Sequence, residues 1–171
     1  MHHYFVTACS IIALAATGAA AAPAAQAPKP TEGYDWALRI DEQERGRPAI
    51  LAYEVPETDD QPLNFSCEEG GGRIFAGLIA GSDDLREITL ASGDQTLRVK
   101  GRLEPSEIDD MPSFTSQEIA GNAPFITAFA ANGWLRMTLA GEIYDMAGTR
   151  AGAKAIAAFV AHCNRPYSPA G

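Results

Sequence analysis

Cys67 and Cys163 are the feature of this sequence that most constrains its fold. A disulfide between them would close a loop of roughly 95 residues, for which a chain-entropy estimate gives about 4.5 kcal/mol of stabilisation. The alternative is two separate buried thiols. The compartment decides between these options, because disulfides persist mainly in oxidising surroundings.

The first 24 residues predict an exported protein. No Lys, Arg, Asp or Glu precedes Lys29, and a short apolar core around Ile11 is followed by small residues. This order is typical of a signal peptide, here over 1–24, and its removal also removes the third cysteine, Cys9. We expect a mature protein in the periplasm of a Gram-negative bacterium or secreted, with no stable membrane span after processing. The two remaining cysteines are then expected to pair.

The length and net charge of the mature protein limit its number of domains and its partners. About 145 residues remain, which suits one domain with a single core. We expect a flexible lead-in over 25–33, a globular domain over 34–165 and a tail over 166–171. All 22 acidic and 13 basic residues lie in the mature part, which keeps the net charge of −9. This charge argues against nucleic acid and anionic membranes as main partners.

Eight stretches of the mature chain carry the apolar patterns of β-strands. Glycine-rich turns separate several of them: Gly70–Gly72 is expected to form a hairpin tip, and Ser92–Asp94 another. The clearest hairpin joins the fifth and sixth stretches. The eight expected strands are 34–41, 49–55, 63–68, 73–80, 86–90, 96–103, 113–119 and 134–140.

Two helices are expected, over 123–132 and 148–164. In the second helix, Ile156, Phe159, Val160 and Cys163 stand at i, i+3, i+4 and i+7 and so share one apolar face. The predicted fold is α+β: a mostly antiparallel sheet or two-layer sandwich of about eight strands, with the C-terminal helix packed on the sheet.

The histidine content limits the catalytic options. His162 is the only histidine of the mature chain, so a His-rich zinc site is excluded. Its place beside the expected disulfide favours a structural or surface role, and we expect no catalytic residue, no metal and no cofactor. The acidic residues are interpreted as solvated loops. A hydrolase using carboxylates such as Asp59 and Glu68 is the alternative.

A basic strip is the candidate binding surface. Strand alternation places Arg98, Lys100 and Arg102 on one face, and Arg136 would join them if the strands are neighbours. Such a strip can select an anionic ligand or an acidic patch on an envelope protein. The alternative is a solvated sheet face with cross-strand pairs to residues such as Glu87.

The layout of the chain resembles a known group of exported proteins. A signal peptide and an aromatic first strand precede Leu-Asn-Phe-Ser-Cys at 63–67, and the strand Trp-Leu-Arg-Met at 134–137 precedes an Ala-rich helix at 153–163. This order is similar to that of the TagO/VasI-like periplasmic accessory proteins of type VI secretion. The resemblance implies a non-enzymatic accessory role in the periplasm.

Three functions therefore stand as hypotheses for this sequence. The first is an exported, disulfide-stapled binding or accessory protein without catalysis. Its partner would be an envelope protein or an anionic ligand. The second is the carboxylate-dependent envelope hydrolase. The third is an inhibitor that binds an envelope-active enzyme.

Overall fold

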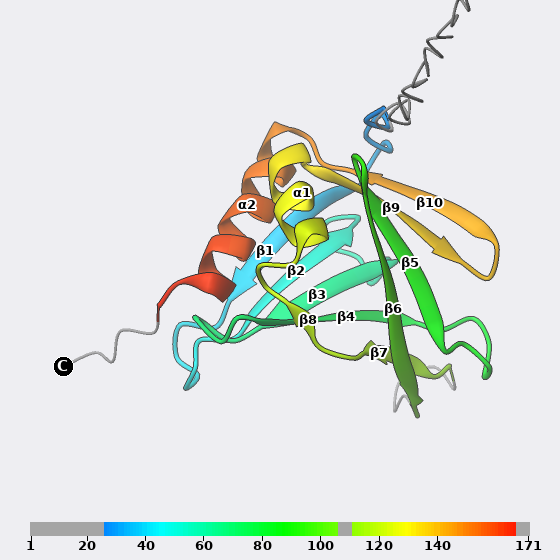
Figure 1. The fold of residues 1–171 in the computed structure, drawn as a ribbon, viewed down its shortest axis with the longest axis horizontal. Coiled ribbons are helices and arrows are strands. Elements are labelled where there is room, and N and C mark those ends of the chain that lie inside the picture. Colours follow the sequence, from blue (N-terminus) through cyan, green and yellow to red (C-terminus); the bar gives the residue numbers. More distant parts are fainter. Residues whose placement is uncertain (1–25, 106–110, 167–171) are drawn as a thin grey trace, which may run out of the picture.

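The computed structural model describes residues 26–105 and 111–166, and within them ten strands and two helices (Figure 1). The expected signal peptide therefore lies outside the described residues, as does most of the expected tail. The strands are β1 (Asp35–Ile40), β2 (Ala49–Glu54), β3 (Leu63–Cys67), β4 (Arg73–Ile79), β5 (Glu87–Ser92), β6 (Gln95–Glu104), β7 (Ser113–Ser116), β8 (Ile119–Ala120), β9 (Trp134–Leu139) and β10 (Glu142–Ala147). The helices are α1 (Pro124–Asn132) and α2 (Arg150–Asn164).

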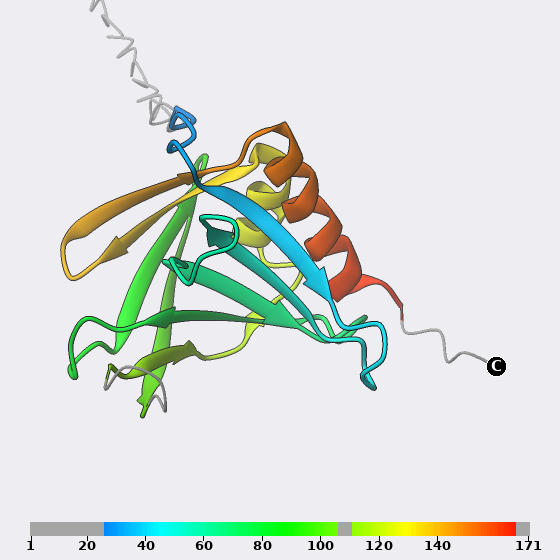
Figure 2. The ribbon, with the colours of Figure 1, turned by 180° about the vertical axis from the view of Figure 1, so that it is seen from behind.

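The strands form one curled antiparallel sheet. Its order is β1-β2-β3-β4-β7-β6-β5-β9-β10, with β8 beside β4. The two end strands approach each other at the start of β1 and the end of β10 and then diverge (Figure 2). At this point the indole Nε1 of Trp36 donates a hydrogen bond to the carbonyl oxygen of Met146 at 3.3 Å. The sheet is thus close to a barrel, and we call the junction of β1 and β10 the seam.

The α+β class and the antiparallel sheet are confirmed, whereas the sandwich and the count of about eight strands are wrong. The pattern misses β8 because it has two residues, and it misses β10 because Glu142 and Asp145 interrupt its apolar residues. A sandwich would need a break between two sheets. Here the ladder of hydrogen-bonded strands runs without a break from β1 to β10.

The expected hairpins are present. β1 pairs with β2, β3 with β4, and β5 with β6. In the last pair, Ile88 faces Val99 and Leu90 faces Leu97, with Ile88, Leu90 and Val99 buried. Alternation then turns the basic residues of β6 outward, as the sequence predicts.

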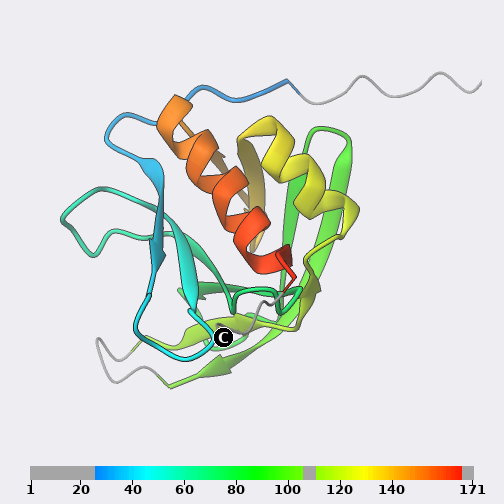
Figure 3. The ribbon, with the colours of Figure 1, turned by 90° about the vertical axis from the view of Figure 1, so that its left-hand side faces the viewer.

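The two helices lie side by side across the open side of the sheet (Figure 3). The predicted apolar face of α2 is buried, with Ile156 and Phe159 at most 1% exposed. The hydroxyl of Thr149 caps this helix by accepting from the backbone amides of Ala151 and Gly152. The C-terminal helix therefore packs as predicted, against β1 and β2.

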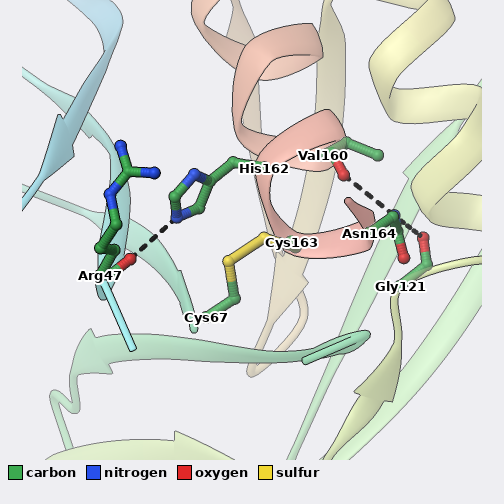
Figure 4. Close-up of a disulfide and its surroundings, with 7 residues drawn as sticks. All are labelled: Arg47, Cys67, Gly121, Val160, His162, Cys163 and Asn164. Carbon is green, nitrogen blue, oxygen red and sulfur yellow. Dashed lines mark hydrogen bonds between the residues drawn. A yellow bond between two sulfur atoms is a disulfide. The ribbon is translucent and has the colours of Figure 1, made fainter. Parts of the chain in front are cut away.

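The expected disulfide between Cys67 and Cys163 is confirmed, with 5.8 Å between the two Cα atoms (Figure 4). It joins the end of β3 to the last turn of α2. The glycine turn after β3 adds two hydrogen bonds: the amide of Gly70 donates to the carbonyl of His162 at 3.0 Å, and that of Gly72 to Cys163 at 2.9 Å. Helix ends leave carbonyl groups without partners, and this turn supplies the donors.

Asn164 and His162 complete the fixation of this helix end (Figure 4). The side-chain amide of Asn164 donates to the carbonyls of Gly121 and Val160 at 2.8 and 2.9 Å. The Nε2 atom of His162 lies 2.8 Å from the carbonyl oxygen of Arg47. The C-terminus of α2 is consequently bound to three separate segments of the chain.

Candidate functional site

The basic strip of β6 is exposed and largely ion-paired. Arg98 donates to Glu87 on the neighbouring strand at 2.8 Å, and Arg102 to Glu104 on its own strand at 2.8 Å. The exposed fractions of the two arginine side chains are 74% and 76%. The structure thus shows the cross-strand pair to Glu87 that was the alternative interpretation, while binding by the strip stays a prediction.

Arg136 faces the same side of the sheet but does not adjoin the strip. It lies on β9, and β5 separates β9 from β6. Arg136 forms two hydrogen bonds to the carboxylate of Asp145 on β10, at 2.6 and 2.9 Å. The hydrogen bond to Asp145 raises the pKa of Arg136, and burial opposes this effect. The guanidinium of Arg136 is therefore already paired with a carboxylate of the protein itself.

The two carboxylates of the hydrolase hypothesis are not brought together. Asp59 lies before β3 and Glu68 after it, so the two residues flank opposite ends of this strand. At about 3.3 Å per residue, such a strand is roughly 13 Å long, which exceeds the separation of about 5–9.5 Å at which paired carboxylates cleave glycosides. His162 is 3% exposed and bound to a backbone oxygen, and so is placed as a structural residue.

A tyrosine-lined pocket opens at the seam. Its volume is about 370 Å³, and its walls come from β10, from the end of β2 and from the residues just before β1. Tyr34 immediately precedes β1, Tyr53 lies near the end of β2, and Tyr144 lies on β10. We call this space the seam pocket; its walls also include Pro62, Asp145 and Met146.

The position of Tyr144 follows from the geometry of the seam. Tyr144 pairs with the buried Met137 and therefore stands on the inward face of the sheet. It is nevertheless 41% exposed, because β10 has a strand neighbour on one side only. The inward face of a sheet is normally covered by core side chains. At the seam it reaches solvent instead and forms one wall of the pocket.

Tyr53 carries a buried hydroxyl without a hydrogen-bond partner among the described residues. The residue is 3% exposed, and its ring stacks on Tyr34 with 5.3 Å between the ring centroids. A buried polar group left unpaired costs about 1–3 kcal/mol. Tyr53 lines the seam pocket, but its hydroxyl oxygen is enclosed by the protein and is not exposed to the open space of the pocket.

Tyr34 is held in place by an acidic loop. Its hydroxyl donates a hydrogen bond to the carboxylate of Asp60, in the loop 56–62 between β2 and β3. This hydrogen bond, followed by burial and the negative charge of Asp60, raises the pKa of the Tyr34 phenol. The hydrogen bond also holds the ring of Tyr34 in the wall of the pocket.

Neither a metal cluster nor a membrane helix is found in the described part of the chain. Within residues 26–105 and 111–166, no three His, Cys, Asp or Glu side chains gather as metal ligands. No helix in these ranges has the length and apolar character needed to cross a membrane.

Comparison with models of protein families, with curated proteins and with solved structures finds no match. The resemblance to the TagO/VasI-like proteins accordingly stays a prediction.

The sequence interpretation missed the seam pocket. The sequence predicts the first two strands and places Tyr53 in step with their apolar residues, but it gives no sign of a pocket. Tyr144 lies in a strand that the pattern does not show, far from Tyr34 in sequence. Only the curling of the sheet brings the two residues to one pocket.

Proposed function

We propose that this protein is an exported binding protein without catalytic activity, and that the seam pocket holds its ligand. The observation that carries the proposal is the open pocket of about 370 Å³ at the seam, whose wall contains three tyrosines from separate parts of the chain. Binding pockets typically combine apolar and aromatic walls with a few polar groups that orient the ligand. The seam pocket has this composition.

The arrangement of the polar groups supports binding over hydrolysis. The wall of the seam pocket contains one carboxylate, Asp145, and it is engaged by Arg136. Carboxylate hydrolysis needs two acidic groups facing one another across the substrate. Asp59 and Glu68, the pair considered for that chemistry, flank opposite ends of β3.

The predicted export and the disulfide are both consistent with a binding protein. The Cys67–Cys163 bond suits an oxidising compartment, as does the predicted signal peptide. A binding protein in the periplasm needs a rigid frame around its site more than it needs moving catalytic parts. The disulfide and the bound end of α2 provide such a frame.

The experiment is a binding screen monitored by NMR. The mature protein, labelled with ¹⁵N, is titrated with a panel of small compounds that includes neutral rings, organic cations and organic anions. We expect at least one class to shift the amide signals of β10 and of residues 31–34. The same compounds are then added to Tyr144→Ala, which removes one wall, and to Ile79→Ala.

Ile79 is a matched control because it is also a large exposed side chain, 52% accessible, on a strand away from the seam. Binding should be lost in Tyr144→Ala and retained in Ile79→Ala. The proposal is wrong if no class of compound shifts the seam signals, or if the Tyr144→Ala variant binds as well as the wild type.

A further inference from the structure

We infer that the ligand group of the seam pocket is an organic cation, specifically an alkylammonium group. This inference rests on the proposed function, because it names the chemistry of the ligand held in the same pocket.

The aromatic rings leave one space for a cation. The rings of Tyr34 and Tyr53 stack at 5.3 Å with an angle of 20° between their planes, so no group fits between them. Tyr144 reaches the pocket from the other side of the seam, on β10. Tyr34, Tyr53 and Tyr144 all line the pocket, so an ammonium group held there would lie beside aromatic rings, which are the partners in a cation–π interaction.

The charges around the pocket favour a positive ligand. Tyr34 is tied to Asp60, and the loop 56–62 that contains Asp60 has three acidic residues and no basic one. Among the described residues, Asp145 is the one charged residue in the pocket wall, and Arg136 pairs with it. The whole chain has a net charge of −9. A negative surface attracts cations and repels anions, so an anionic ligand is disfavoured.

The size of the seam pocket suits a small ligand group. Choline and the side chain of lysine represent the two sources of an alkylammonium group, a free small molecule and a peptide. The pocket volume of about 370 Å³ falls at the small end of ligand pockets, which typically measure about 300–1,000 Å³.

The test compares three probes of related shape by NMR titration of the mature protein. Choline carries a quaternary ammonium group, and 3,3-dimethyl-1-butanol has the same shape without the charge. Nα-acetyl-lysine amide represents a peptide side chain. We expect choline or the lysine amide to bind at the seam about tenfold more tightly than the neutral alcohol.

Two variants of Tyr144 separate the cation–π interaction from simple apolar contact. Tyr144→Phe retains an aromatic ring and should retain binding of the cation. Tyr144→Leu retains an apolar side chain without a ring and should weaken it about tenfold. Both substitutions are at a side chain that is 41% exposed, so folding should be preserved.

The outcomes separate this inference from the proposed function. Binding by choline alone indicates a free ligand, and binding by the lysine amide indicates a peptide; either result supports the inference. Equal affinity for the neutral alcohol overturns the cation but leaves the seam pocket as a binding site. If none of the three probes binds, the inference is wrong, and the wider panel described above decides the proposed function separately.

Discussion

Tyr34 illustrates how one side chain connects a loop to the pocket. Its ring stacks on Tyr53 in the pocket wall, and its hydroxyl donates to Asp60 in the loop between β2 and β3. The hydrogen bond stabilises the neutral phenol, and the negative carboxylate disfavours the phenolate. Both effects raise the pKa of Tyr34.

Asp60→Asn should lower the pKa of Tyr34 towards its ordinary value. A raised pKa in the folded state means that this hydrogen bond stabilises the protein below the ordinary tyrosine pKa and ceases to do so as the phenol ionises. The measurement is a ¹³C NMR titration of the tyrosine ring carbons into the alkaline range. An unchanged titration of Tyr34 in the variant would contradict the assigned role of Asp60.

Gly152 provides a second prediction for a single residue. Alanine normally stabilises a helix relative to glycine by about 1 kcal/mol. Here the added Cβ would collide with the side chain of Asp35 and the backbone nitrogen of Trp36, because α2 lies directly against β1. Gly152→Ala should therefore destabilise the protein by about 1–2 kcal/mol.

The measurement for Gly152→Ala is the free energy of unfolding from urea denaturation. Gly81→Ala is the control, since nothing lies within 4 Å of a Cβ at this position and its backbone is not left-handed. The control should change stability by less than about 0.5 kcal/mol. A more stable Gly152→Ala variant would show that α2 does not approach β1 as described.

The sequence pattern predicts β6 and α2 but does not predict β10. In β6 and in α2, the apolar residues recur at the period of the element, so the buried face can be identified from the sequence. In β10, Ile143 and Tyr144 are both exposed because the strand lies at the end of the sheet, and no alternation develops. Strand pairing with β9 defines β10.

The basic strip on β6 can be tested for its effect on stability and on binding. Replacing Arg98, Lys100 and Arg102 together by serine should change the free energy of unfolding by less than about 1 kcal/mol, because ion pairs of exposed side chains contribute little. If the strip also binds a partner, the variant should fail to capture that partner from an envelope extract. Capture equal to that of the wild type would show that the strip is not a binding face.

The whole molecule is a nearly closed sheet whose helical side is held by one disulfide. The pairing of Cys67 with Cys163 could be predicted from the cysteine count and the compartment. The closure could not, because curvature arises from the combined twist of all the strands. The seam pocket depends on that closure, which explains why the sequence interpretation did not predict it.

Cys163→Ser should lower stability without affecting ligand binding at the seam. Loss of the long loop closure costs up to about 4.5 kcal/mol in the chain-entropy estimate. The melting temperature of the mature protein, compared with and without the substitution under oxidising conditions, measures this loss. An unchanged melting temperature would show that the disulfide does not stabilise the fold.

Contact between a bound cation and the tyrosine rings would show directly that the seam pocket binds alkylammonium groups. Nuclear Overhauser effects are recorded between the N-methyl protons of choline and the mature protein. We expect contacts to the ring protons of Tyr34 and Tyr144, both of which line the seam pocket. Contacts confined to another surface, or no contact to either ring at saturating choline, would contradict this expectation.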